Sequence, residues 1–312
     1  MPILCCGQYS GRKLRYFTVK RWLIAIILCW AAASAGAQQG TLLLNELLFQ
    51  PASGEAEYLE LYNNSDAAIE LADYHIVRWV GDSLGRHYAL PTHTVAPHDY
   101  VVLTKDAASV AACFFVKYPS KVVECPLPAY PNTGGSVILA TADSTVVDRL
   151  DYQPDMHSRL LRNKAGVSLE RRSFDRPTGD VSNWFSAAST VGYGTPGYEN
   201  SQSTEYLVEE TALAFSSTLL SPDGDDYQDK LEISYMLDRG DLTATAALYD
   251  LRGTRVCQLL NNDLPGTHGT LTWDGRDDNG ALLPRGQYIL QITLFDPTGT
   301  RQTLRRTVAL MR

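Results

Sequence analysis

The sequence predicts an all-β protein: two β-sandwiches in tandem, with one short helix, behind an N-terminal targeting segment. Hydrophobic residues make up 45% of the chain and charged residues 20%, as in folded soluble proteins. Short apolar or alternating runs, bounded by clusters of Gly, Pro, Asn and Asp, recur along the chain and indicate strands. The length of 312 residues is enough for about two domains of roughly 100–200 residues each.

The first 37 residues have the three-part pattern of a secretory signal peptide. A basic stretch (12–21) precedes an apolar run (22–30), and an A-x-A cleavage site (35–37) precedes Gln38. The apolar run is shorter than the roughly 20 residues that a membrane-spanning helix needs, which disfavours the alternative of an uncleaved anchor. We therefore expect an exported protein that is not integral to a membrane. It would lie at the cell surface, in association with the outer membrane, or outside the cell.

Charge is divided unevenly between this leader and the rest of the chain. The formal net charge is -8, and residues 1–37 hold five basic residues and no acidic one. The remainder carries 22 basic against 35 acidic residues, a balance of -13. A body this acidic is a poor non-specific partner for nucleic acid. The basic stretch that could still bind nucleic acid comprises Arg159, Arg162, Lys164, Arg171, Arg172 and Arg176.

The first half is expected to contain short strands and one helix. The segment 106–117 is rich in alanine, begins at Asp106 and stops before Pro119, which predicts a short capped helix. In the run 58–62, Leu59 and Leu61 share one face and Glu60 lies on the other. The expected strands are 42–49, 58–62, 69–80, 100–104, 136–140, 146–152 and 167–171.

Glu46 and Glu60 fall on facing strands of this pattern and could be neighbours. Two nearby carboxylates can divide acid and base roles in catalysis, but such a pair cannot be chosen without geometry. The favoured interpretation is that both are strand-edge polar residues, or hydrogen-bond partners for backbone turns.

A change in composition divides the chain. Residues 189–206 are rich in Gly, Ser and Thr, which predicts a domain boundary. We expect a first domain over 38–190, a linker over 191–210 and a second domain over 211–312. The second domain shows seven short strands in about 100 residues and no helix, which is typical of an immunoglobulin-like sandwich. These strands are expected at 212–220, 231–237, 243–250, 255–260, 269–273, 287–295 and 301–310.

The first domain resembles the lamin-tail domain family, which occurs in nuclear lamins and in exported bacterial proteins. The motifs appear in family order: Asn45-Glu46, Glu57–Asn63, Asn132–Leu139, Val147–Tyr152, His157, Gly166–Arg171, Asn183-Trp184 and Gly194–Gly197. Met156 stands where the bacterial group normally has an aromatic residue before the histidine. The resemblance covers about residues 40–200. It implies a compact immunoglobulin-like sandwich that serves as a binding or structural module.

The second domain resembles the immunoglobulin-like domain of the flagellar hook-capping (FlgD-like) family, in the form found at the C-termini of exported Bacteroidetes proteins. The motifs are Leu220–Asp229, Leu248–Gly253, Thr272–Gly275 and Arg285–Ile289. In that phylum such sandwiches, ending in a basic strand like Leu304–Arg312, can act as sorting signals for type IX secretion. The resemblance therefore implies a role in structure or in sorting, with the secretion machinery as a partner.

Three cysteines, Cys113, Cys125 and Cys257, follow the leader. Export permits disulfides, and Cys113 and Cys125 are close in sequence across a helix-to-strand connection. A disulfide between these two and a pair of free thiols are both compatible with the sequence. Cys257 lies in an apolar strand pattern and is expected to be buried.

One loop is a candidate calcium site. Asp223, Asp225, Asp226 and Asp229 are grouped around a glycine, and Ca²⁺ takes six to eight carboxylate and carbonyl oxygens. The twelfth-position Glu of an EF-hand is missing, so the alternative is a solvated turn whose aspartates bind its own backbone. The histidines show no metal-ligand spacing, and we expect them to lie apart at strand edges and in loops.

No catalytic residue and no cofactor other than calcium are predicted. The sequence has no nucleophile elbow, no C-x-x-C pair and no phosphate-binding glycine loop before a helix. The favoured hypothesis is an exported, non-enzymatic β-sandwich protein that binds an unknown protein, matrix or cell-surface partner. The alternative is a secreted hydrolase such as a nuclease, or an accessory module of one.

Overall fold

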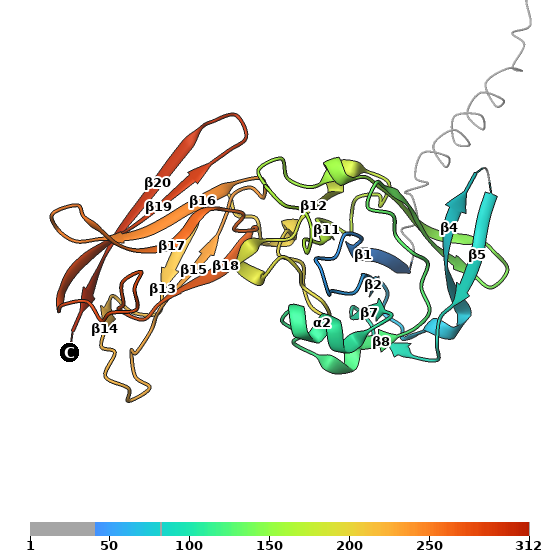
Figure 1. Ribbon diagram of the computed structural model, residues 1–312, viewed down its shortest axis with the longest axis horizontal. Helices are drawn as coiled ribbons and strands as arrows, with labels where there is room; N and C mark the ends of the chain where they lie inside the picture. Colours follow the sequence, from blue (N-terminus) through green and yellow to red (C-terminus); the bar gives the residue numbers. More distant parts are fainter. Residues whose placement is uncertain (1–40, 82, 312) are drawn as a thin grey trace, which may run out of the picture. The chain divides into compact units, whose positions relative to one another are not determined.

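The computed structural model describes residues 41–81 and 83–311 of the chain. In these residues almost all regular structure is β-strand, with one α-helix (Figure 1), so the predicted fold class is confirmed. The predicted signal peptide lies outside the described residues. No helix in the described part is both long and apolar enough to cross a bilayer.

The first sandwich packs a six-stranded sheet, in the order β12-β11-β1-β2-β7-β8, on a four-stranded sheet, in the order β10-β9-β4-β5. Side chains that alternate along the strands, such as Leu59 and Leu61, meet between the sheets in one apolar core. A two-stranded sheet joins β3 to β6. The bounds are β1 Leu42–Leu48, β2 Tyr58–Asn63, β3 Ile69–Glu70, β4 Tyr74–Val80, β5 Ser83–Ala89, β6 Thr94–Val95, β7 Tyr100–Thr104, β8 Val122–Glu124, β9 Gly135–Thr141, β10 Val146–Tyr152, β11 Leu169–Arg171 and β12 Trp184–Ser186.

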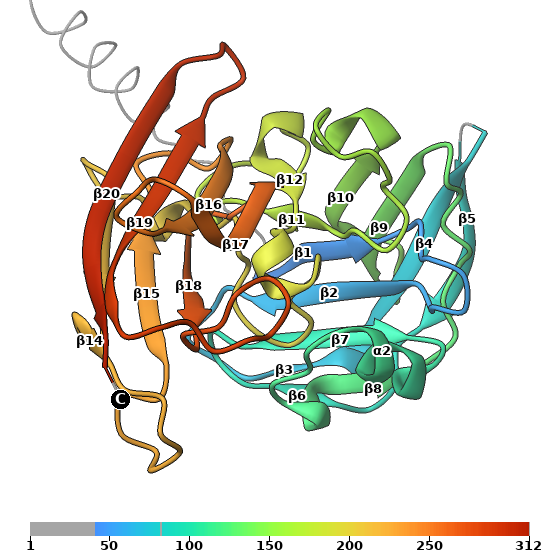
Figure 2. The same ribbon diagram turned by 60° about the vertical axis from the view of Figure 1, so that its left-hand side comes forward.

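The outer face of the six-stranded sheet is also covered. The helix α2 (Ala107–Cys113) lies beside β7 and β8 (Figure 2) and packs Val110 on apolar side chains of the sheet. As predicted, Asp106 caps this helix, because its side chain accepts a hydrogen bond from Ser109 N at 2.9 Å. Every residue of β1 and β2 is therefore buried, whichever face of the sheet it occupies.

The second sandwich packs a three-stranded sheet, in the order β13-β15-β18, on a five-stranded sheet, in the order β14-β20-β19-β16-β17. In β15 the side chains of Leu231, Ile233 and Tyr235 are buried and those between them are exposed, the period that the sequence shows. The inner faces of the two sheets share one core. The bounds are β13 Ala212–Phe215, β14 Leu219–Leu220, β15 Leu231–Met236, β16 Thr243–Tyr249, β17 Arg255–Asp263, β18 His268–Trp273, β19 Gly286–Phe295 and β20 Arg301–Leu310.

The strand limits differ from the prediction in two ways. The expected strand 69–80 divides into β3, a 3-10 turn (Leu71–Asp73) and β4, and the expected strand 212–220 divides into β13 and β14. The sequence also does not predict β5, β6, β8 and β12, since none of these short strands shows sustained apolar alternation.

Much of the segment expected to be a linker, 191–210, packs against the first sandwich. Thr195, Asn200, Ser201 and Gln202 are each at most 4% exposed. A flexible linker would leave its polar backbone to water, whereas here buried side chains bind it. The Gly, Ser and Thr content that predicted a linker instead allows close packing.

The two neighbouring cysteines of the first sandwich do not form a disulfide. Cys113 is exposed at the end of α2, and Cys125 is buried in the apolar core; both are free. The helix leaves the Cys113 thiol exposed, while Cys125, directly after β8, is buried in the core, so of the two alternatives the structure has the free thiols. Cys257 is buried and free.

Candidate functional site

Three glutamates form a buried row across neighbouring strands of the first sandwich. Glu46 of β1 lies opposite Glu170 of β11 on one side and opposite Glu60 of β2 on the other. All three side chains are fully buried, on the face of the sheet that points away from the apolar core. A β-bulge between Leu44 and Glu46 brings Asn45 to the same face. We call these three residues the glutamate row.

The backbone of the segment 195–202 donates to each member of the glutamate row. A carboxylate moved out of water needs such donors, because an unpaired buried charge is very costly. The segment in turn has no strand partner for these amides, so each side satisfies the other. The three bonds join Thr195 N to Glu46 Oε1 (3.0 Å), Gly197 N to Glu60 Oε2 (2.6 Å) and Gln202 N to Glu170 Oε2 (2.9 Å).

Hydroxyl groups complete the network around Glu46. Tyr58 donates its hydroxyl proton to Glu46 Oε1 at 2.7 Å, and the Ser168 hydroxyl donates to the same oxygen. Thr195 Oγ1 lies 3.2 Å from Glu46 Oε2 and 2.9 Å from Glu170 Oε1. One hydroxyl proton cannot serve both carboxyl groups at once, so Thr195 donates to one of them at a time.

Burial raises the pKa of every carboxyl group in the glutamate row. For Glu170 burial, and then the charge of Glu46, raise the pKa to about 8, although Ser201, Thr195 and Gln202 donate hydrogen bonds that oppose the shift. Burial and the Glu46 charge raise the pKa of Glu60 well above its ordinary value. The pKa of Glu46 is also raised by burial, against four hydrogen bonds that favour its charged form. Burial thus favours the protonated form of each member, and Glu170 is largely protonated at pH 7.

The Gly194-Thr-Pro-Gly197 motif is explained by close packing on this row. A Cβ atom at Gly194 would lie 2.6 Å from the Tyr58 hydroxyl oxygen and 2.7 Å from the Phe114 ring. Gly197 has φ +86°, a conformation that other residues adopt only with strain. The motif thus lets the segment lie directly on the sheet, which closes the row to solvent.

His157, another residue of the predicted family pattern, is buried beside the same sandwich core. Its Nδ1 lies 2.9 Å from Ser186 Oγ, and its ring is 5.4 Å from that of Phe49. Burial, and then the charge of Lys164, lower the pKa of His157 to about 4. The imidazole is therefore neutral at pH 7 and has a packing role.

Two histidines that the sequence leaves apart are brought together in the structure. His75 of β4 and His87 of β5 are half-buried, and their Nδ1 atoms are 3.2 Å apart. The expectation of separate histidines was wrong for this pair because β5 was not predicted, and its pairing with β4 is what joins them. By contrast, His98 is exposed and contacts Asp66 at 2.8 Å.

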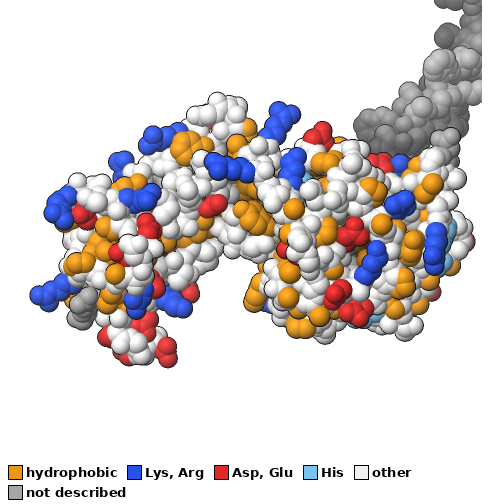
Figure 3. Space-filling model, in the orientation of Figure 1, with side chains coloured by type: hydrophobic (Ala, Val, Ile, Leu, Met, Phe, Trp, Pro, Cys, Tyr) orange, Lys and Arg blue, Asp and Glu red, His pale blue; other side chains and the backbone are white. Residues whose placement is uncertain are grey.

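The acidic loop between β14 and β15 gathers three of its four predicted ligands. Carboxylate oxygens of Asp223, Asp225 and Asp229 lie within 4.8 Å of one another, whereas Asp226 is not part of the group. Figure 3 shows the acidic side chains at the tip of this loop. Asp229 also accepts hydrogen bonds from the backbone N–H of Gly224 (2.8 Å) and of Asp226 (2.9 Å). These bonds are the backbone-binding role that the sequence allowed as the alternative to calcium.

The predicted basic stretch does not form one free surface. Arg171 is buried, and its guanidinium donates to Leu44 O at 3.1 Å and to Thr178 Oγ1 at 2.7 Å. Arg176 donates to Asp180 Oδ2 at 2.6 Å. The buried guanidinium of Arg171 therefore holds a turn in place and is not available to phosphates.

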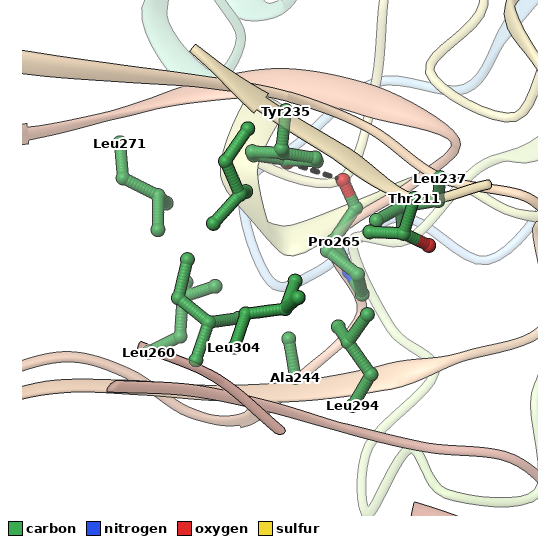
Figure 4. Close-up of a pocket in the computed structure, with 11 residues that line it drawn as sticks. Thr211, Tyr235, Leu237, Ala244, Leu260, Pro265, Leu271, Leu294 and Leu304 are labelled. Atoms are coloured by element: carbon green, nitrogen blue, oxygen red, sulfur yellow. Dashed lines mark hydrogen bonds between the residues drawn. The ribbon is translucent and has the colours of Figure 1, made fainter. Parts of the chain in front are cut away.

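The second sandwich has an apolar recess between its two sheets (Figure 4). Its lining is aliphatic apart from Thr211 and Tyr235. The Tyr235 hydroxyl already donates to Pro265 O at 2.5 Å. The recess therefore offers no converging polar groups that could orient a ligand.

One family model matches part of the first sandwich. Residues 35–154 match the model of the Lamin Tail Domain family. This match supports the lamin-tail resemblance and an immunoglobulin-like first sandwich. The matched range contains Glu46 and Glu60, but it ends before Glu170 and before the segment 195–202. No curated protein matches the chain.

Several solved structures are weakly similar. FlgD from Pseudomonas aeruginosa is 20% identical over 31% of this chain and 66% of its own, with a TM-score of 0.23. PorU from Porphyromonas gingivalis is 10% identical over 89% of this chain and 21% of its own (TM-score 0.26). PorZ, a surface component of the type IX secretion system of that organism, is 11% identical over 85% and 30% (TM-score 0.25). The chain thus spans under two thirds of each of these structures.

Sequence reasoning placed Glu46 and Glu60 as possible neighbours but missed Glu170 and the covering segment. The signal for Glu170 was present, because it alternates with Leu169 in a strand that belongs to the same family pattern. No local pattern shows that residues 195–202 fold back on this strand, since the contacts span 25 to 149 positions of the chain.

Proposed function

We propose that the protein is an exported, non-enzymatic binding or structural module. Its first sandwich would bind a protein, matrix or cell-surface partner, and its second sandwich would serve structure or type IX secretion sorting. One observation carries the proposal: the glutamate row, the best acid–base candidate in the described residues, is fully buried and bound to the chain's own backbone. A substrate cannot touch these carboxylates unless the segment 195–202 leaves the sheet.

The alternative, a secreted hydrolase such as a nuclease, is tested directly. We expect no turnover by the full chain in nuclease and glycosidase assays with Ca²⁺ or Mg²⁺ present. Turnover that is abolished by one of Glu46→Gln, Glu60→Gln or Glu170→Gln would show that the row is catalytic and would overturn the proposal. Glu232→Gln, on an exposed position of β15, is the matched control.

The export and sorting parts are tested in cells. We expect the mature chain to begin at Gln38 and to appear at the surface or in the medium. If the basic end of β20 is read as a sorting signal, replacing the exposed residues Arg305 and Arg306 by Gln retains the protein inside the cell envelope. Arg301→Gln, at the other end of the same strand, is the control. Surface delivery that survives the double change would leave the second sandwich a structural role.

Calcium binding by the acidic loop stays a prediction. Asp223, Asp225 and Asp229 have oxygens close enough to share an ion, but the same aspartates bind the backbone of their own loop.

A further inference from the structure

We propose that His75 and His87 form a two-histidine site for a divalent transition-metal ion such as Zn²⁺, on the outer face of the four-stranded sheet. The proposal is independent of the proposed function. It begins with the register of β4 and β5, in which His75 lies opposite Ala89 and Val77 lies opposite His87. The two histidines are therefore diagonal neighbours across the strand pair, and both point away from the core, since Ile76 between His75 and Val77 faces inward.

The distance between the two ring nitrogens fits a shared ion. The Nδ1 atoms are 3.2 Å apart and the rings are nearly perpendicular. With Zn–N bonds of about 2.0–2.1 Å, this separation gives an N–Zn–N angle of about 100–106°, close to the tetrahedral angle that zinc adopts. Neutral imidazole also suits copper and nickel, so zinc is one member of the class of ions that the pair would take.

The surroundings favour an ion on the outer side of the pair. Beside the histidines, on the same face of the sheet, Val77, Ile138 and Ala140 form a small apolar cluster, and each is fully buried. His75 lies opposite Ala140 of β9, so this apolar cluster adjoins the site on one side. In the described residues no third His, Cys, Asp or Glu joins the pair within ligand distance. Two or more coordination positions are therefore left for water or for a ligand from outside the chain.

Without metal, the same geometry allows an N–H···N hydrogen bond, in which one histidine carries its proton on Nδ1. Metal binding requires both Nδ1 lone pairs, so that histidine must move its proton from Nδ1 to Nε2 while the other keeps its proton on Nε2. When both rings are neutral, no proton is released. The change of tautomer gives a signature that a purely structural histidine pair would not show.

The test is a Zn²⁺ titration of the ¹⁵N-labelled full chain, followed by imidazole ¹H–¹⁵N spectra. We expect the Nδ1 signals of both His75 and His87 to become metal-bound and both Nε2 atoms to be protonated. The signals of His93 and His98 should not move. This readout separates the pair from carboxylates and thiols, which are also zinc-ligand types but carry no imidazole nitrogen.

Substitutions of single histidines provide a second test of the two-histidine site. His87→Ala should abolish the zinc-dependent change at His75 and lower zinc affinity at this site at least about tenfold, since even an outer-shell partner is worth that much. His93→Ala, which removes a histidine outside the pair, should leave the affinity unchanged. The proposal is overturned if excess Zn²⁺ leaves the two Nδ1 signals in their hydrogen-bonded state, or if His87→Ala and the wild type bind equally well. The wild-type spectra decide even if a variant fails to fold.

Discussion

Glu170 makes the stability of the first sandwich depend on pH. Its pKa is about 8 in the folded protein and near 4.5 in the unfolded chain, so between these values the folded state holds a proton that the unfolded state has lost. The contribution of Glu170 to stability is fully present below about pH 4.5 and is lost as pH rises through 8. The direction is opposite to that of a salt-bridged carboxylate, because burial, the largest cause of the shift, disfavours the charged form.

We therefore expect Glu170→Gln to flatten the alkaline side of the stability profile. The amide has the shape of the protonated carboxyl and can donate to Thr195 Oγ1 while still accepting from Gln202 N. The free energy of unfolding of the wild type should fall between pH 5 and 9 by at most about 1.4 kcal/mol per pH unit for this one proton. Denaturant titrations across this range measure the slope.

For this test Glu232→Gln is the control, because it makes the same chemical change at an exposed position. It should leave the slope as it is in the wild type. A Glu170→Gln variant whose unfolding free energy fell with pH as steeply as the wild type would show that this carboxyl group is not the source of the dependence.

At the level of elements, strands with a clear period were predictable and irregular segments were not. The limits of β7, β10 and β20 agree with the sequence pattern, and the helix begins at its predicted cap. In contrast, β5 contains Gly85, whose missing side chain matters because a Cβ there would meet Val80 at 2.9 Å. Because close packing around Gly85 shapes β5, its sequence shows no apolar alternation from which the strand could be predicted. Because β5 was not predicted, the proximity of His75 and His87 was not predicted either, since it results from the register of β4 and β5.

The packing of the segment 195–202 on the first sandwich was not predicted, for a different physical reason. Its small polar residues are typical of linkers, and composition cannot distinguish a solvated backbone from one bound by buried carboxylates. The face of β2 that carries Glu60 was predicted correctly, as opposite to Leu59 and Leu61. Its burial was not, because the residues that cover it lie more than 130 positions away in the sequence.

Because the glutamate row binds this segment, its backbone should resist hydrogen exchange like a strand. Thr195→Val keeps the shape of the side chain but removes the hydroxyl between Glu46 and Glu170. We expect a loss of about 1–3 kcal/mol, the usual cost of leaving a buried polar group unpaired, together with faster exchange of the amides of Gly197 and Gln202.

Thr307→Val provides the comparison for this variant, since Thr307 is exposed on β20. An exposed change of this kind usually costs no more than about 0.5 kcal/mol. Equal effects of the two substitutions, or unchanged exchange across the segment in Thr195→Val, would contradict a tethering role for the row.

At the scale of the whole described chain, the same segment links the two sandwiches. Ser201, whose side chain donates to Glu170 at 2.8 Å, accepts a bond at its carbonyl from Thr267 N at 2.8 Å. Thr267 belongs to the buried loop between β17 and β18, and the neighbouring Leu264 accepts from Ser189 N at 2.9 Å. The carboxylates of one sandwich thus fix the backbone on which a loop of the other rests, which couples the stability of the loop to the glutamate row.

A substitution at Gly266, which lies in that loop, should break this coupling. It has φ +77°, and a Cβ atom there would lie 2.6 Å from Ser201 O, a backbone atom with little freedom to move. Gly299→Ala is the matched control, because φ is +88° and nothing lies within 4 Å of the added atom. Both variants carry the strain of a left-handed alanine, about 1 kcal/mol, but only Gly266→Ala adds overpacking, typically about 1–3 kcal/mol more. Unfolding and hydrogen-exchange measurements should therefore show a larger loss for Gly266→Ala, with faster exchange in the segments 187–203 and 264–268. If Gly266→Ala behaves like Gly299→Ala, the loop is not held against the segment, and the two sandwiches are stable independently of each other.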